Sequence, residues 1–362
     1  MDPTSQPPHK RFIKWAIGAI AVLAVLVVFL WGYGGLSTVM SFWSGPKSTT
    51  TPMPSGALLL TISAASTSGD SLGVGPFTLL MNSGETYVRP FYDEPLTDPS
   101  PSFEYNTSSD LSYGVFLGVA GGKSTNTNGF TIYRADLRAG SDHASLMQEF
   151  AHADALVLPS DSDSYREAPV VSTQGTVLYA SLSADEYTKN IDQIGKLKAE
   201  DWNMYEVGAD GSAQLTTHGV RPKWIDASHF AYLRNDGIYL YDLTTHTEEK
   251  VWSSSSTLSI ANGFDVSDDS SLVALSDPAA GTLTVIRALN WTGNILSTLT
   301  TVSPIIATNL TFSPDDQYLA ALVTRDDGSI ALEYYSFADA MFISPNPPLD
   351  PSIKAFYITD WK

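Results

Sequence analysis

Three kinds of residue pattern in this chain could do chemistry, and the first is a glycine-rich run. The run from Gly118 to Thr125, GVAGGKST, resembles a P-loop, in which backbone N–H groups cradle a phosphate. Three residues separate Gly118 from Gly122 where that motif requires four, and the run lies between two apolar strands rather than before a helix. We therefore interpret it as a hairpin loop.

The second pattern consists of side chains that ligate metals. His143 and His152 have no third histidine near them, and the chain has no HExxH motif, so the converging ligands of a zinc site are missing. Asp161 and Asp163 match a fragment of a calcium loop that lacks its glycine and closing glutamate. No metal or other cofactor is predicted. Calcium binding at these or at turn aspartates stays an alternative.

The third pattern would be a catalytic nucleophile or a pair of carboxylates. The chain has no cysteine and no sialidase-type Asp box. Its 39 Asp and Glu residues offer many pairs, but sequence alone cannot bring two together. No catalysis is assigned, and a glycan-binding or glycan-processing protein is the alternative.

A small basic group stands out on an acidic chain. Against the 39 acidic residues there are 20 Lys and Arg, and the net charge of -19 argues against a nucleic-acid partner. Lys189, Lys196 and Lys198 lie together in an insertion in which apolar residues recur at helical spacing. Because insertions on repeat scaffolds often carry binding, we predict a partner-binding site there, which Lys→Glu changes should weaken. The alternative is a helix that only packs on the rim.

A polar turn followed by an apolar strand recurs along the chain and would position these residues. Full copies begin at Ser108, Ser172, Ile225, Ser267 and Ser313. Ser and Asp side chains satisfy backbone N–H groups in such turns. The turn residues singled out are Ser108, Asp110, Ser267, Asp269, Ser313 and Asp315. A period of about 40–50 residues with short strands is typical of propeller blades.

The repeat predicts an all-β fold, a six-bladed β-propeller over residues 56–362. Each unit reads as a strand, a polar turn, a strand, a glycine turn, a strand and an outer strand. Five units are complete, and the sixth combines strands near residues 57–92 with a C-terminal strand at 354–361 that closes the ring. Seven blades are the alternative if residues 138–169 contain further strands.

Two segments carry a family resemblance. FSPDDQYLAAL, which begins at Phe312, and the run from Tyr205 to Leu243 resemble the repeats of TolB-like six-bladed propellers, also called WD-like repeats. The resemblance covers most of residues 56–362 and implies an extracytoplasmic, bacterial propeller that binds proteins or ligands. TolB has an extra α/β domain where this chain has an apolar segment and linker, so TolB's partners are not carried over.

The N-terminal segment has the features of a membrane anchor. Residues 15–35 form an uncharged apolar run long enough to span a bilayer. Basic residues before it predict a cytoplasmic stub at 1–14, and a Ser/Thr/Pro linker follows at 36–55. The flanking residues on which this depends are Lys10, Arg11, Lys14, Trp15 and Trp31. A cleaved signal peptide is the alternative.

Together these features predict a single-pass membrane protein with its propeller outside the cytoplasm. We expect a protein-binding or scaffold module of the cell envelope with a protein partner. From Gly56 onward the chain carries a net charge of -22, which should hold it away from anionic lipid surfaces. The sequence does not identify the partner, the ligand or the oligomeric state.

Overall fold

The computed structural model describes residues 56–65, 71–82, 85–90, 100–110, 112–119, 130–137, 153–158, 160, 163–208, 210–288, 291, 296–344 and 353–361. For residues 56–105, 118–119, 353–357 and 359–360 it describes the backbone alone. The predicted stub, anchor and linker lie outside these residues. No helix in the described ranges is long and apolar enough to cross a membrane.

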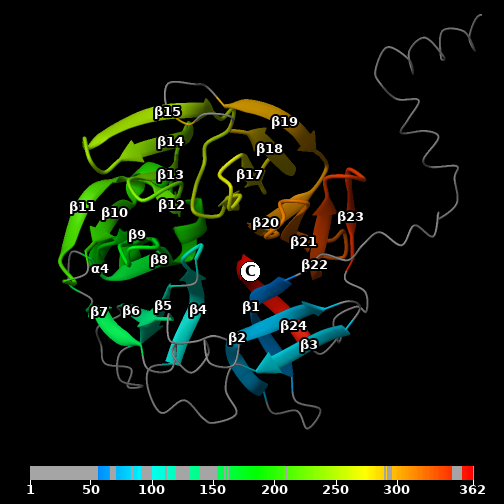
Figure 1. The fold of residues 1–362 in the computed structure, drawn as a ribbon, viewed down its shortest axis with the longest axis horizontal. Coiled ribbons are helices and arrows are strands. Elements are labelled where there is room, and N and C mark those ends of the chain that lie inside the picture. The colour runs from blue at the N-terminus through cyan, green and yellow to red at the C-terminus, as the bar shows by residue number, and fades with distance from the viewer. Residues whose placement is uncertain are drawn as a thin grey trace, which may run out of the picture. The chain divides into compact units, whose positions relative to one another are not determined.

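Strands form six four-stranded antiparallel sheets in the described ranges, arranged around a common centre (Figure 1). Five sheets consist of strands consecutive in the chain. The first contains β4 (Ser100–Thr107), β5 (Tyr113–Val119), β6 (Thr131–Asp136) and β7 (Asp154–Val157). The second contains β8 (Tyr165–Val171), β9 (Val177–Leu182), β10 (Asn203–Val207) and β11 (Ala213–His218). The third contains β12 (Val220–Trp224), β13 (His229–Arg234), β14 (Gly237–Asp242) and β15 (Thr247–Ser253).

The remaining three sheets complete the arrangement. One contains β16 (Phe264–Val266), β17 (Leu272–Asp277), β18 (Thr282–Arg287) and β19 (Ser297–Val302). The next contains β20 (Ile306–Phe312), β21 (Tyr318–Thr324), β22 (Ile330–Ser336) and β23 (Met341–Ile343). The last joins the two ends of the chain in the order β24-β1-β2-β3, with β24 (Ile353–Trp361), β1 (Gly56–Ala65), β2 (Ser71–Asn82) and β3 (Glu85–Pro90).

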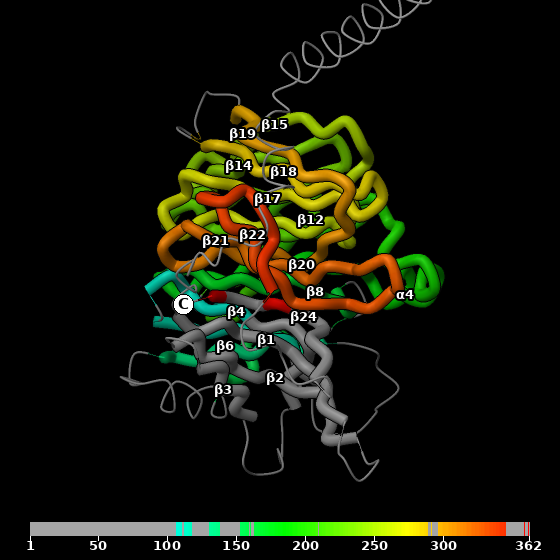
Figure 2. The backbone as a smooth tube through the Cα atoms, turned by 90° about the vertical axis from the view of Figure 1, so that its right-hand side faces the viewer, coloured from blue at the N-terminus to red at the C-terminus, as the bar shows by residue number. Residues whose placement is uncertain are grey.

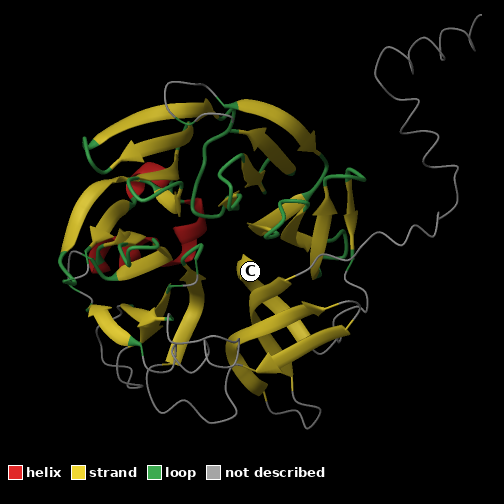
Figure 3. Cartoon of the chain, in the orientation of Figure 1, coloured by secondary structure: helices red, strands yellow, loops and turns green. Residues whose placement is uncertain are grey.

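The innermost strand of each sheet contacts the innermost strand of the next. These contacts run from β4 through β8, β12, β16 and β20 to β24, and β24 in turn contacts β4. Figure 3 shows the strands, in yellow, set around the centre of this arrangement. The prediction of an all-β propeller is therefore confirmed.

The sheets pack face to face, and this explains the composition of their strands. The second strand of a sheet lies between two neighbouring sheets, so β9 and β21 are buried on both faces and read as nearly continuous apolar runs. Between the β4–β7 and β8–β11 sheets, for example, Val115 and Ile132 pack with Val177 and Tyr179. The outer strands face solvent on one side, and β11 and β19 are accordingly rich in Thr and other polar residues.

The repeated turn is built by one hydrogen-bond pattern. The Ser313 hydroxyl donates to Asp315 Oδ1 at 2.6 Å and accepts from the Tyr318 N–H at 2.9 Å. The Asp315 carboxylate in turn accepts from the Gln317 N–H at 3.2 Å. The turns that begin at Ser108 and Ser267 make the same three bonds, with Asp110 and Asp269 in the place of Asp315. All six singled-out side chains therefore hold turns between an innermost strand and the next strand.

The insertion between β9 and β10 forms three short helices, α4 (Ala184–Asn190), η2 (Ile191–Lys196) and η3 (Ala199–Asp201). Ser183 and Glu186 form a capping box at the start of α4. Because β9 runs antiparallel to the innermost strand β8, the insertion follows the end of β9 that is remote from the repeat turns. In the side view of Figure 2, α4 projects from one face of the propeller.

Candidate functional site

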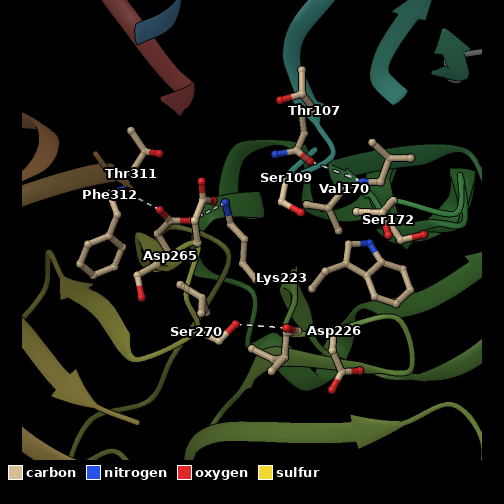
Figure 4. A pocket seen from close by; sticks show the side chains of 18 of the residues that line it. Thr107, Ser109, Val170, Ser172, Lys223, Asp226, Asp265, Ser270, Thr311 and Phe312 are labelled. Atoms are coloured by element: carbon tan, nitrogen blue, oxygen red, sulfur yellow. Dashed lines mark hydrogen bonds and ion pairs between the residues drawn. The ribbon is translucent and has the colours of Figure 1, made fainter. Parts of the chain in front are cut away.

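A cavity of about 150 Å³ lies where the innermost strands meet (Figure 4). All six sheets contribute to its wall through their innermost strands. Five of these strands contribute the end that leads into the repeat turn, and β24 contributes its C-terminal end. Contributing residues, one from each innermost strand, are Thr107, Val171, Lys223, Asp265, Phe312 and Trp361. Residues of the repeat turns, among them Asp226, Asp268 and Ser270, complete it. The cavity is therefore the mouth of the central channel on the face that carries the turns.

An ion pair crosses the cavity wall from one sheet to the next. Lys223 Nζ lies 2.6 Å from Asp265 Oδ1, and the side chains are only 21% and 7% exposed. Asp265 Oδ2 also accepts a hydrogen bond from the Phe312 N–H at 2.8 Å. Asp265 of β16 thus connects β12 on one side with β20 on the other, and it fixes the position of the lysine in the channel.

Further hydrogen bonds hold the turns around the cavity. Ser270 Oγ donates to the Ile225 carbonyl at 3.1 Å, and the Trp291 indole N–H donates to the Ser270 carbonyl at 2.8 Å. On the other side, the Val171 N–H donates to Asn106 Oδ1 at 3.4 Å. The cavity wall is therefore formed before any ligand arrives, which limits the conformational entropy that binding would cost.

Asp226 presents a carboxylate at the cavity rim. Its Oδ1 accepts hydrogen bonds from the Ser228 and His229 N–H groups, each at 2.8 Å, and the His229 ring nitrogen Nδ1 lies 2.9 Å away. Burial raises the pKa of Asp226, but hydrogen bonds from Ser228 and His229 outweigh it and hold the pKa below its usual range. Its side chain is 54% exposed, so the ionised group is open to a ligand.

Two neighbouring turns bring aspartates together beside the cavity. Burial, and then the negative charges of Asp269 and Asp268, raise the pKa of Asp316 to about 7. Hydrogen bonds from Ser271 and Ser267 to Asp269 outweigh its burial and lower its pKa, so that carboxylate stays ionised. Near neutral pH, Asp316 exchanges its proton while its neighbour remains charged.

This arrangement predicts a stability that depends on pH. Between about pH 4 and pH 7 the folded chain keeps a proton on Asp316 that the unfolded chain has released, so this group makes the free energy of unfolding fall as pH rises. Replacing Asp316 by Asn should reduce the decrease in the free energy of unfolding between pH 5 and pH 8. The reduction should be ~1 kcal/mol or less, since solvent screens a partly exposed group. Urea unfolding of both proteins at pH 5 and pH 8 measures the difference.

Asp327→Asn is the matched control for this measurement. Hydrogen bonds from Ser329 lower the pKa of Asp327, so it stays ionised in both states from pH 5 to pH 8 and should leave the slope unchanged. Asn also suits the positive φ of 54° at residue 316. An unchanged slope in Asp316→Asn would contradict the assignment of the proton to this carboxyl group.

Trp224 has a mixed position that sequence reasoning did not anticipate. From the sequence, Trp224 is expected to pack between blades, as are Tyr239, Tyr241 and Trp252. Its ring does pack against Phe230, with ring centroids 6.1 Å apart. It also lines the cavity, and its buried indole N–H finds no acceptor among the described residues. Trp224 is therefore a packing residue whose exposed edge contributes to the site.

The predicted partner-binding insertion lies away from this cavity. Lys189, Lys196 and Lys198 are exposed, and Lys198 Nζ lies 3.6 Å from Glu200 Oε1. The insertion also carries five acidic residues, Asp185, Glu186, Asp192, Glu200 and Asp201, so it is not a basic surface. Tyr187 stacks on Tyr165 with ring centroids 4.2 Å apart, and Ile194 packs on the core, which agrees with a helix fixed to the propeller.

Several sequence candidates fall outside the described residues or have another role. His143, His152, Asp161 and most of the glycine-rich run after Gly118 lie outside them. Asp163, considered above as a calcium ligand, is instead buried and paired with Arg166. In the described ranges, no three His, Asp or Glu side chains converge in a way that could hold a metal ion.

Comparisons with known proteins address the fold. No protein-family model and no curated protein sequence matches the chain. Among solved structures, TolB from Acinetobacter baumannii is similar, with 15% identity and a TM-score of 0.52 over 86% of this chain and 68% of that one. A chain of the nidogen/laminin complex has 10% identity and a TM-score of 0.50 over 84% and 98%. A putative TolB from Agrobacterium tumefaciens has 14% identity and a TM-score of 0.44 over 86% and 99%.

The fold and the channel mouth together define the chain as a β-propeller with a preformed central cavity. The likeness to TolB agrees with the resemblance of the repeats. At these identities the likeness shows the fold alone, and the role of the cavity has to be argued from its own residues.

Proposed function

We propose that this protein is a membrane-anchored, extracytoplasmic propeller that acts as a binding module of the cell envelope, with the channel mouth as its ligand site. The observation that carries the proposal is the cavity to which the innermost strands of all six sheets contribute. β24 contacts both β4 and β20, so Trp361, near the C-terminal end of the domain, reaches the same cavity as Thr107. No reaction is assigned.

A glycan ligand in the same channel is the second candidate. Such a ligand calls for acidic, hydroxyl and aromatic side chains that converge at the channel mouth, and Asp226, Ser270 and Trp224 do so. A scaffold that bound its partner only through the insertion would not need this convergence. Contact of the insertion with a partner, through Lys189, Lys196 and Lys198, is therefore the less supported form of the proposal.

Co-purification tests where the partner binds. The full-length protein is solubilised mildly from its native membrane, and the proteins that accompany it are identified. Ala227 is an exposed turn residue of the cavity wall, so Ala227→Trp should block the mouth without disturbing the core. We expect a stoichiometric partner that this variant loses by at least about tenfold and that a variant with Glu at residues 189, 196 and 198 keeps.

The other outcomes separate the alternatives. If the variant with Glu at residues 189, 196 and 198 loses the partner while Ala227→Trp keeps it, the channel-mouth proposal is overturned. The contact then lies on the insertion. A protein that purifies alone would oppose the scaffold role. Binding of the full-length protein to a glycan array, abolished by Ala227→Trp, would then favour the glycan candidate.

A further inference from the structure

The fourth residue of a repeat turn reaches back to the preceding turn at two places around the channel mouth. The turns concerned belong to three successive sheets and span residues 225–229, 267–271 and 313–317. Ser270 and Asp316 hold the fourth position in the second and third of these turns, with positive φ angles of 59° and 54°. The Ser270 hydroxyl donates to the Ile225 carbonyl at 3.1 Å. The Asp316 carboxyl group hydrogen-bonds the Asp269 carboxylate, so side chains link all three turns.

The two links differ in their dependence on pH. A bond from a hydroxyl to a carbonyl contains no group that titrates near neutral pH, whereas two carboxyl groups in contact need a shared proton because two ionised groups would repel each other. Asp316 is the group that carries it. Its Oδ1 is buried and has no hydrogen-bond partner among the described residues, so an ionised Asp316 would leave charge on an unpaired oxygen. Asp269 is held ionised by the Ser271 N–H at 2.8 Å.

The groups around Asp316 favour this proton near neutral pH. Burial, followed by the charges of Asp269, Asp268 and Asp315, raises the pKa of Asp316 to about 7. The nearby basic groups of the mouth are each held by another acid, Lys223 by Asp265 at 2.6 Å and His229 by Asp226 at 2.9 Å. Both protonation states of the link are therefore populated close to pH 7.

Loss of the proton acts on one part of the cavity wall. Turn 267–271 contributes to the wall, and so do Thr311 and Phe312, which lead into turn 313–317. Beneath the two turns, the Phe312 N–H donates to the buried Asp265 carboxylate at 2.8 Å and holds the innermost strands together. Repulsion between the turns therefore separates them above a fixed base, as a hinge does.

We infer that the proton shared by Asp316 and Asp269 is a latch that closes one side of the channel mouth. In mildly acidic solution the latch is closed and the cavity has the size described above. In mildly alkaline solution the proton passes to water, both carboxylates are charged, and the two turns move apart and widen the mouth. The inference rests on the proposed function and names a regulation of the same site by pH.

Distances between spin labels, measured by electron paramagnetic resonance on the full-length protein in detergent, test the latch. The chain contains no cysteine, so labels attach only at introduced positions. The measuring pair is Ala227→Cys with Pro314→Cys, two exposed residues on turns either side of turn 267–271. We expect this distance to lengthen from pH 5 to pH 8 with a midpoint near pH 7.

A second pair shows which turn moves. Ala227→Cys with Ser109→Cys joins two exposed turn residues of the cavity wall that the latch does not connect. Its distance should stay the same from pH 5 to pH 8. This pair also registers any movement of turn 225–229 that titration of His229 causes.

Two substitutions of Asp316 set the latch in opposite states. Asn and Gly both accept the positive φ at this position. Asp316→Asn donates an amide N–H to Asp269 at any pH, so the measuring pair should keep its short distance at pH 8. Asp316→Gly removes the link, so the pair should show the long distance already at pH 5. Asp327→Asn removes one charge from an exposed turn and should keep the wild-type change.

Three results would overturn the latch. One is a measuring distance that does not change with pH, and another is a change that persists in Asp316→Asn. The third is an equal change in both label pairs, which would assign the movement to turn 225–229. None of these results bears on the Ala227→Trp test of the channel mouth as the ligand site. Retention of the partner in Ala227→Trp, with the distance change intact, would contradict the proposed function alone.

Discussion

Replacing Arg166 with Met is expected to lower the free energy of unfolding by about 3–5 kcal/mol, the range for breaking a buried ion pair from one side. The Arg166 side chain is fully buried and the Asp163 side chain is 8% exposed, with Nη2 2.5 Å from Asp163 Oδ2. Removal of the guanidinium leaves the carboxylate in the interior without its counter-charge.

The geometry explains why no other residue can substitute for this arginine. Its five N–H groups have five acceptors: Asp163 receives two of them, and the carbonyls of Phe130, Val157 and Leu158 receive the others at 2.8–3.0 Å. Lysine has three donors and would leave some of these carbonyls unpaired. Because the three carbonyls precede β8 in the chain, Arg166 ties β8 to the neighbouring sheet, and β8 carries Val170 and Val171 of the cavity wall.

Urea unfolding of the full-length protein in detergent, followed by tryptophan fluorescence, measures this loss. The control is Arg325→Met, because Arg325 pairs with Glu333 at 3.0 Å but its side chain is 50% exposed. Such a pair contributes about 1 kcal/mol or less. Adding Asp163→Asn to Arg166→Met should recover part of the loss, since the uncompensated charge is gone. Equal small losses in the two single Met variants would show that the buried pair contributes no more than a surface pair.

The repeat in the sequence predicts the fold because its turn has a local cause. The Ser hydroxyl and the Asp carboxylate two residues later bond backbone groups within the same turn, so their spacing is visible in a single chain. The repeat also carries a signal for the cavity. The residues two positions before each aligned turn all line it, namely Asn106, Val170, Lys223, Asp265 and Thr311.

The pairing of charged side chains in the cavity and in the core is harder to predict from the sequence. Lys223 and Asp265 are 42 residues apart in the sequence, and only the closure of neighbouring sheets brings them within 2.6 Å. Asp163 looked like part of a calcium loop because sequence shows its acidic neighbour but not Arg166 folding back over it. The lysines of the insertion looked like a basic patch because their acidic neighbours were not weighed with them.

Trp202 is the second position where one change should have a large effect. It follows the insertion, is fully buried, and packs in the cluster that joins the β8–β11 sheet to the two sheets after it. Trp202→Ala should lower the free energy of unfolding by about 3–5 kcal/mol through lost apolar burial and the cavity left behind. That loss would also detach the insertion, because Tyr165, which stacks on Tyr187 of α4, packs against Trp202.

The indole N–H of Trp202 makes the change to Phe the sharper test. No described residue accepts a hydrogen bond from this buried group, so folding removes it from water without replacement, at a cost of about 1–3 kcal/mol. Trp291 lies in the same cluster, but its N–H donates to the Ser270 carbonyl at 2.8 Å. Trp202→Phe should therefore cost about 1–3 kcal/mol less than Trp291→Phe in urea unfolding. Equal losses of unfolding free energy in the two variants would mean that the Trp202 indole N–H has a hydrogen-bond acceptor. A larger loss in Trp202→Phe than in Trp291→Phe would show that the volume of the indole, rather than its N–H group, determines stability in this part of the core.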